Sequence, residues 1–104
     1  MVRNTYHMSK PALRDLEKRL IECLLEVQDI SGAEVVTINT DTCPIKDLPG
    51  FDSLRGVEAT IILSSKLKIK IDASKGEVNL FVSKDGRRAL RVREISERIL
   101  TLTS

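Results

Sequence analysis

The residues best placed for chemistry lie in the segment GFDSL, within DLPGFDSLRGVEA at residues 47–59. Ser53 follows a Pro-Gly turn and Asp52, at the point where a helical pattern begins. A Ser or Asp there is commonly the N-cap, worth about 1 kcal/mol, because its side-chain oxygen accepts a hydrogen bond from a free backbone N–H. The same N–H groups and the positive dipole end also favour a phosphodiester on Ser53. The segment therefore fits two interpretations, a helix cap or a covalent attachment point.

Two neighbours of Ser53 bear on this choice. The Asp52 carboxylate could bind Mg²⁺ brought by a modifying enzyme, because Mg²⁺ prefers oxygen ligands. Gly56 lies three residues after Ser53, on the same helix face, and it costs about 1 kcal/mol of helix propensity relative to Ala. Room for a prosthetic group would justify this glycine, and so would close packing of the preceding loop.

The apolar positions after Ser53 follow helical spacing. Leu54, Val57 and Ile61 trace one stripe of the expected helix. We expect these three side chains to pack in the core rather than to contact a bound group.

Other nucleophiles and metal ligands have little support. Cys23 and Cys43 show no CxxC spacing, and the only histidine, His7, lies in the N-terminal segment. No apolar run approaches the roughly 20 residues that span a bilayer. The N-terminus also lacks the apolar region of a signal peptide. We expect a cytoplasmic protein with reduced thiols, no metal site and no membrane insertion.

Three helices are expected to position Ser53. The first covers residues 10–28, ends at Ser31-Gly32, and has apolar residues at helical spacing: Leu13, Leu16, Leu20, Leu24 and Val27. A long ordered loop over residues 33–52 leads to the second helix, which begins at Ser53. The last helix covers residues 91–100. The fold class is therefore mainly α, a small helical bundle with three main helices.

The segment at residues 68–82 is the least regular. KLKIKID and EVNLFV both alternate and flank Lys75-Gly76, so they could pair as a short β-hairpin, or the segment could be irregular. Asp85-Gly86, flanked by basic residues, predicts a solvated turn. We expect residues 1–8 to be a flexible tail and residues 9–104 to form a single domain.

Charge is distributed unevenly along the 104 residues. Residues 1–52 hold 6 Lys/Arg and 9 Asp/Glu (−3), and residues 53–104 hold 11 and 6 (+5), which sum to the net charge of +2. The basic half fits a docking face or a solvated surface. Aromatic residues are limited to Tyr6, Phe51 and Phe81, so a stacking platform for bases is not expected.

With the motif in its setting, the chain resembles the acyl carrier protein family, including peptidyl carrier domains. The resemblance covers residues 13–100 and is carried by Asp52, Ser53 and Leu54 at a helix start, by Val57 and Glu58 after them, and by Leu48 and Gly50 before them. It implies that Ser53 carries 4′-phosphopantetheine, with Asp52, Leu54 and Gly56 flanking the attachment site. The implied partners are a phosphopantetheinyl transferase, which uses Mg²⁺, and enzymes that load and process the acyl or aminoacyl thioester. The protein itself would be a monomeric carrier and no enzyme.

The chain departs from this family in charge. The family's second helix is typically acidic, whereas here Glu58 is the only acidic residue after the triplet and Arg55, Lys66, Lys68 and Lys70 are basic. We expect a specialised carrier that docks partners through Arg55, Glu58 and Lys66. The alternative is a small basic interaction or nucleic-acid-binding domain in which Ser53 is only a helix cap. It lacks a recognition motif, so we expect no nucleic-acid partner.

Overall fold

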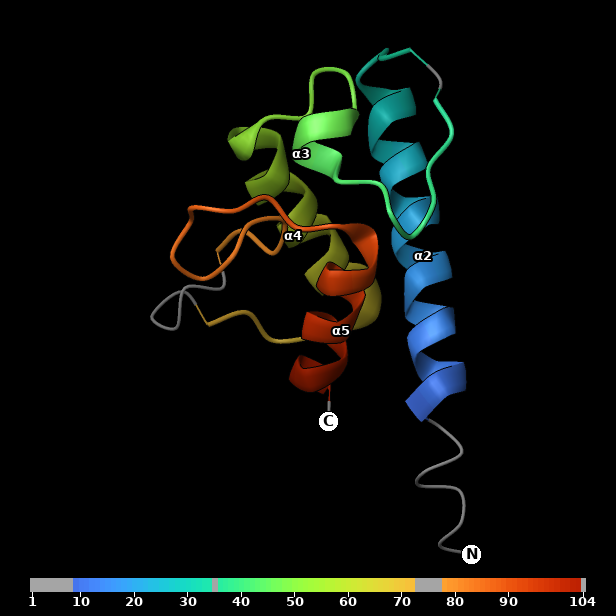
Figure 1. Cartoon of the computed structure of the whole chain (residues 1–104), viewed down its shortest axis with the longest axis vertical. Coiled ribbons are helices and arrows are strands. Elements are labelled where there is room, and N and C mark those ends of the chain that lie inside the picture. Colours follow the sequence, from blue (N-terminus) through green and yellow to red (C-terminus); the bar gives the residue numbers. More distant parts are fainter. Residues whose placement is uncertain (1–8, 35, 73–77, 104) are drawn as a thin grey trace, which may run out of the picture.

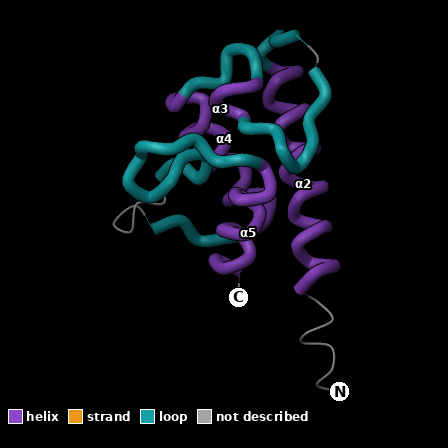
Figure 2. Tube along the Cα trace, in the orientation of Figure 1, coloured by secondary structure: helices purple, strands orange, loops and turns teal. Residues whose placement is uncertain are grey.

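The structure is a computed structural model that describes residues 9–34, 36–72 and 78–103 (Figure 1). Within these ranges it contains no strand and four helices: α2 (Ser9–Ile30), α3 (Pro44–Asp47), α4 (Ser53–Leu67) and α5 (Val92–Thr103). Figure 2 shows helices and loops, and no strand, over these described ranges. The predicted class, a mainly α small helical bundle, is confirmed. The predicted flexible tail at residues 1–8 lies outside the described residues.

Helix α2 forms where the apolar spacing predicts it. The helix packs against α4 and α5. The buried residues of its inner face are Leu16, Leu20, Cys23, Leu24 and Val27. The helix ends at the predicted Ser31-Gly32 pair: the Ser31 N–H donates to the Val27 carbonyl, and Gly32 has a φ of 74°. Glycine adopts this left-handed conformation without steric cost, so it stops the helix cleanly.

Helix α5 buries the stripe that the sequence predicts. Val92, Ile95 and Ile99 are fully buried, and the helix runs three residues past the predicted end at Leu100. At its start, a Glu94 carboxylate oxygen accepts a hydrogen bond from the Arg91 N–H at 3.0 Å. This side chain satisfies a backbone donor that the first turn leaves free.

Helix α4 begins at Ser53 as predicted, but its buried face is different. Leu54 is 69% exposed and Ile61 is 64% exposed, so the expectation that they pack in the core is wrong; Val57 is half-buried. The inner face instead consists of Gly56, Ala59, Thr60 and Leu63. Small residues face inward because the loop at residues 79–81 lies directly on this side of the helix.

The segment at residues 68–82 is irregular in its described part. Residues 68–72 and 78–82 form no strand, and the only β-type pairing here is one antiparallel bridge from Val82 to Ala89. The predicted turn at Lys75-Gly76 lies outside the described residues. Leu80 and Phe81 are fully buried, and the Phe81 ring lies 5.1 Å from that of Phe51. Two consecutive side chains are therefore buried by a docked loop, not by a strand with alternating faces.

Candidate functional site

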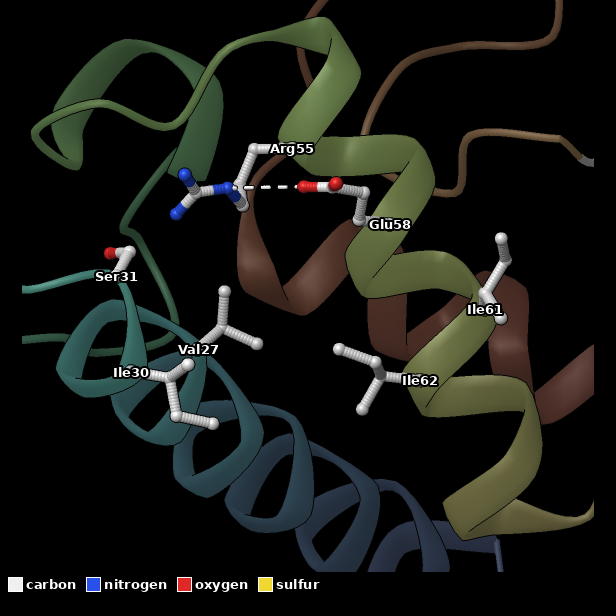
Figure 3. Close-up of a pocket in the computed structure, with 7 residues that line it drawn as sticks. All are labelled: Val27, Ile30, Ser31, Arg55, Glu58, Ile61 and Ile62. Atoms are coloured by element: carbon white, nitrogen blue, oxygen red, sulfur yellow. Dashed lines mark ion pairs between the residues drawn. The ribbon is translucent and has the colours of Figure 1, made fainter.

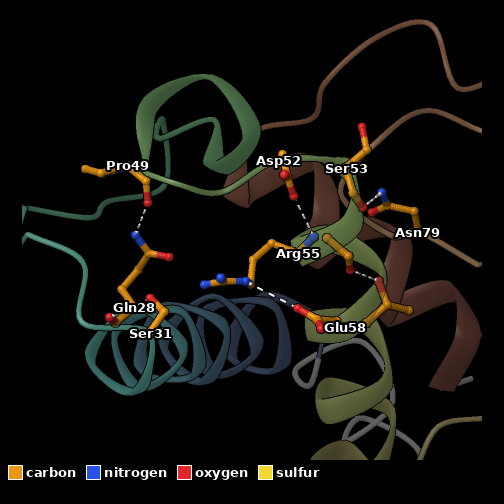
Figure 4. Close-up of polar contacts among 10 residues, drawn as sticks. Gln28, Ser31, Pro49, Asp52, Ser53, Arg55, Glu58 and Asn79 are labelled. Atoms are coloured by element: carbon orange, nitrogen blue, oxygen red, sulfur yellow. Dashed lines mark hydrogen bonds and ion pairs between the residues drawn. The ribbon is translucent and has the colours of Figure 1, made fainter.

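The N-terminal turn of α4 presents Ser53 to solvent. The N-cap is Asp52, whose Oδ1 accepts a hydrogen bond from the Arg55 N–H at 2.8 Å. Ser53 is therefore the first helical residue rather than the cap, and it is exposed. Its hydroxyl points away from the helix (Figure 4) and has no hydrogen-bond partner among the described residues. Of the two side chains that could cap this helix, only Asp52 does so.

An open hollow of about 350 Å³ lies beside Ser53. Side chains from α3 and the following turn line it: Ile45, Leu48, Gly50, Phe51, Asp52 and Ser53. One wall is anchored to α2, because Gln28 Nε2 donates to the Pro49 carbonyl at 2.8 Å (Figure 4). Gln28 is only 4% exposed and Pro49 is exposed, so this hydrogen bond is partly buried. The long loop before Ser53 is thus ordered in its last part, as the sequence predicts.

Gly56 is explained by close packing. A Cβ added at Gly56 would lie 2.7 Å from Asn79 Oδ1 and 2.8 Å from Asn79 Nδ2. The space next to Gly56 is therefore filled by the Asn79 amide, and the expectation that it is left open for a prosthetic group is not met. The packing partner is also not the preceding loop but a segment 23 residues further along the chain.

Asn79 and Thr60 hold the loop at residues 79–81 against α4. Asn79 Nδ2 donates to the Ser53 carbonyl at 3.1 Å, and Asn79 Oδ1 accepts from the Phe81 N–H at 2.9 Å. The buried Thr60 hydroxyl donates to the Gly56 carbonyl at 2.7 Å and accepts from the Leu80 N–H at 2.9 Å. The first two turns of α4 are thereby tied to a loop that is distant in sequence.

A groove of about 470 Å³ separates the C-terminal end of α2 from α4 (Figure 3). Arg55 and Glu58 form an ion pair of 3.3 Å within it, and the other lining residues are Val27, Ile30, Ser31, Ile61 and Ile62. Ile30 is 77% exposed. The groove is mostly apolar, and its two charged lining residues, Arg55 and Glu58, pair with each other.

The three predicted docking residues do not lie together. Lys66 faces a different cavity, where its Nζ lies 3.3 Å from Glu26 Oε2 on α2. Cys23 lines the same cavity; burial raises the pKa of its thiol, a rise that Lys66 opposes and Glu26 adds to. Both Lys66 and Arg55 are thus neutralised by a carboxylate, so the positive charge that the sequence places on α4 is largely compensated.

The basic residues near the C-terminus are used in a turn and in ion pairs. Gly86 has a φ of 74°, and the Asp85 carboxylate accepts from the Ser83 hydroxyl and from the Arg87 N–H at 3.0 Å. Arg88 Nη1 lies 2.9 Å from Glu94 Oε2. The predicted turn at Asp85-Gly86 is confirmed, and its surroundings are exposed.

Sequence reasoning missed Asn79, Thr60 and Gln28. Each makes one hydrogen bond with a residue at least 20 positions away in the chain: Gln28 with Pro49, Thr60 with Leu80, and Asn79 with Ser53. The one local signal was Gly56, since an unexplained glycine inside a helix indicates a close approach by another segment.

Comparison of the chain with protein-family models, curated proteins and solved structures finds no match. The fold and the site therefore define its class as a small, mainly α helical bundle with an exposed serine at the start of α4. In the described part of the chain, no helix has the length and apolar character to cross a membrane. The same residues contain no group of three or more His, Cys, Asp or Glu that could hold a metal ion.

Proposed function

We propose that this protein is a specialised acyl or aminoacyl carrier whose Ser53 bears 4′-phosphopantetheine. The observation that carries the proposal is the division of roles at the start of α4. Asp52 accepts the capping hydrogen bond, so the Ser53 hydroxyl is exposed and free of hydrogen bonds to the described residues. A serine that served only as the cap would be engaged with the backbone N–H groups of the first turn.

The attachment chemistry is a group transfer in which coenzyme A is the donor. The Ser53 oxygen attacks the phosphorus on the pantetheine side of the pyrophosphate. The P–O bond to 3′,5′-ADP breaks, and the hydroxyl proton is released. The transferase supplies the base and the Mg²⁺, and Asp52 is the carboxylate nearest in sequence that could join the metal's ligands. Since the resulting phosphodiester is anionic, it is stabilised at the positive end of the helix dipole.

The surroundings of Ser53 suit a carrier. The open hollow beside Ser53 leaves room along the attached arm, and the half-buried Ile45 is the apolar side chain at its surface, since Leu48 and Phe51 are buried. On the other flank, the exposed Leu54 and Ile61 give partner enzymes an apolar surface, next to the ion pair of Arg55 and Glu58. Exposed apolar patches of this kind mark interaction sites. Lys66 would contact only a partner that also reaches the C-terminal end of α4, eleven residues beyond Arg55.

Intact-protein mass measurement tests the proposal. The protein is incubated with coenzyme A, Mg²⁺ and a broad-specificity phosphopantetheinyl transferase. We expect the wild type and Ser65→Ala, a control on the same helix, to gain one phosphopantetheinyl group. Ser53→Ala should gain none. A wild type that gains no mass while a known carrier is modified in the same tube would rule the proposal out.

A further inference from the structure

We propose that Asn79 is a positioning residue for Ser53, holding the first turn of α4 so that the Ser53 hydroxyl is presented in one place for transfer. This inference rests on the carrier function proposed above. Asn79 does not contact the hydroxyl itself, since its amide reaches the backbone carbonyl of Ser53 at 3.1 Å. Its effect on transfer would therefore be exerted through the backbone of the helix.

The contacts of Asn79 link Ser53 to the core. The Asn79 amide uses both ends, because Nδ2 donates to Ser53 and Oδ1 accepts from the Phe81 N–H at 2.9 Å. Phe81 is fully buried, and its ring packs on Phe51, which lies just before the N-cap. Asn79 thus links the backbone of the exposed serine to the buried core, and Figure 4 shows its contact with Ser53.

Gly56 and Thr60 support this arrangement. The missing side chain at Gly56 leaves the space that the Asn79 amide occupies. One turn further on, the Thr60 hydroxyl fixes the Leu80 N–H at 2.9 Å, so the neighbour of Asn79 is held as well. A helix glycine costs about 1 kcal/mol relative to Ala. The hydrogen bond from Asn79 to Ser53, which the glycine makes possible, offsets this loss of helix propensity.

Rigidity at Ser53 matters because helix ends fray and because transfer needs a well-placed nucleophile. A displacement of about 1 Å from the reactive geometry can reduce a rate roughly 100-fold. For a transferase docked on the exposed face of α4, the Ser53 hydroxyl keeps a constant position and orientation only while the first turn stays formed. Loss of the Asn79 contact should therefore slow the chemical step more than it weakens docking.

The test compares Asn79→Asp with Asn39→Asp. An aspartate at residue 79 still accepts from the Phe81 N–H but cannot donate to the Ser53 carbonyl. Asn39 is a matched control, because its Oδ1 also accepts from a backbone N–H, that of Asp41 at 2.8 Å, and because the substitution adds the same charge. Asn79→Ala is the uncharged second variant. Urea unfolding first establishes that each variant is folded.

In steady-state transfer assays with varied carrier concentration, we expect Asn79→Asp and Asn79→Ala to lower kcat by about 10-fold or more, with KM changed by less than about 2-fold. Asn39→Asp should match the wild type. Amide hydrogen exchange at Arg55 and Gly56 should be faster in both Asn79 variants, while α5 is unchanged.

Equal kcat values in the wild type and both Asn79 variants would overturn the inference and leave the carrier function intact. An equal loss in Asn39→Asp would overturn it too, because the effect would then not be specific to the contact of Asn79 with Ser53. A wild type that is not modified at all would instead refute the carrier function, and the role of Asn79 in transfer with it.

Discussion

The side-chain amide of Asn79 occupies the place where a side chain at Gly56 would begin, with Asn79 Oδ1 2.7 Å from the position of the missing Cβ. The two residues are 23 positions apart in the chain, and their contact brings the loop at residues 79–81 onto the first turns of α4. This contact explains the glycine at residue 56, because a side chain there would displace the Asn79 amide.

The first prediction concerns this pair. Gly56→Ala should lower the free energy of unfolding by about 1 kcal/mol, because displacing Asn79 disrupts two hydrogen bonds worth about 0.5–1.5 kcal/mol each, which outweighs a gain of about 1 kcal/mol in helix propensity. In the Asn79→Ala background the sign should reverse, since the space is then empty. Urea unfolding of the four proteins in this double-mutant cycle measures the coupling. Additive effects would contradict the packing account.

A second prediction separates Asp52 from Ser53. Asp52→Ala should cost about 1 kcal/mol of stability, because it removes the cap on the Arg55 N–H. Ser53→Ala should stay within about 0.5 kcal/mol of the wild type, because its hydroxyl is exposed and forms no hydrogen bond within the described chain. Chemical denaturation checks both values. If Ser53→Ala is as destabilising as Asp52→Ala, then Ser53 is a cap and the carrier proposal loses its main support.

The sequence predicts those features of the structure that depend on neighbouring residues. It does not predict those that depend on contacts between residues far apart in the chain. Helices α2 and α5 have one large apolar stripe each, so their spacing identified both the helices and their buried faces. Helix α4 has apolar residues on two sides. Helical spacing with Val57 assigns Leu54 and Ile61 to the core, whereas the buried positions are Gly56, Ala59, Thr60 and Leu63. Small residues there admit the loop at residues 79–81, a reason that exists only in the folded molecule.

The candidate site divides in the same way. The position of Ser53 at a helix start and the cap at Asp52 depend on neighbours in the sequence, and both were within reach of prediction. The pairing of Lys66 with Glu26 crosses from α4 to α2, and it removes Lys66 from the groove that holds Arg55. Net charge along the sequence could not reveal which cations are already compensated.

A third prediction follows from Glu94 at the start of α5. Hydrogen bonds from the Arg91 N–H and from Arg88 lower the pKa of the Glu94 carboxyl. Its contribution is therefore complete above the unfolded pKa, near 4.3, and is lost as the pH falls through the lower folded pKa. Glu94→Gln should be less stable than the wild type at pH 7 by at most about 1 kcal/mol, because the group is close to solvent, and equally stable near pH 2. Thermal unfolding across this pH range, with Glu97→Gln as the control on the same helix, tests it. If the stability difference between the wild type and Glu94→Gln is the same at all pH values, it does not come from the ionised Glu94 carboxylate.

A fourth prediction uses the two cysteines. Cys23 and Cys43 are both buried, and burial raises the pKa of the Cys23 thiol, so little reactive thiolate is available. In the unmodified native protein both thiols should react slowly with a disulfide reagent. Two equivalents of reactive thiol should be detected only in denaturant. After phosphopantetheinylation, one fast-reacting thiol should appear, that of the arm. Two fast thiols in the unmodified native protein would show that the cysteines are accessible.

The most direct test of the carrier function is to locate the modification. Trypsin cleaves after Lys46 and Arg55 and releases the peptide DLPGFDSLR, residues 47–55, in which Ser53 is the only hydroxyl side chain. After incubation with coenzyme A, Mg²⁺ and a phosphopantetheinyl transferase, tandem mass spectrometry of this peptide reports on Ser53 alone. We predict that it carries one phosphopantetheinyl group and that every other peptide is unchanged. An unmodified 47–55 peptide beside a fully modified control carrier would contradict the account.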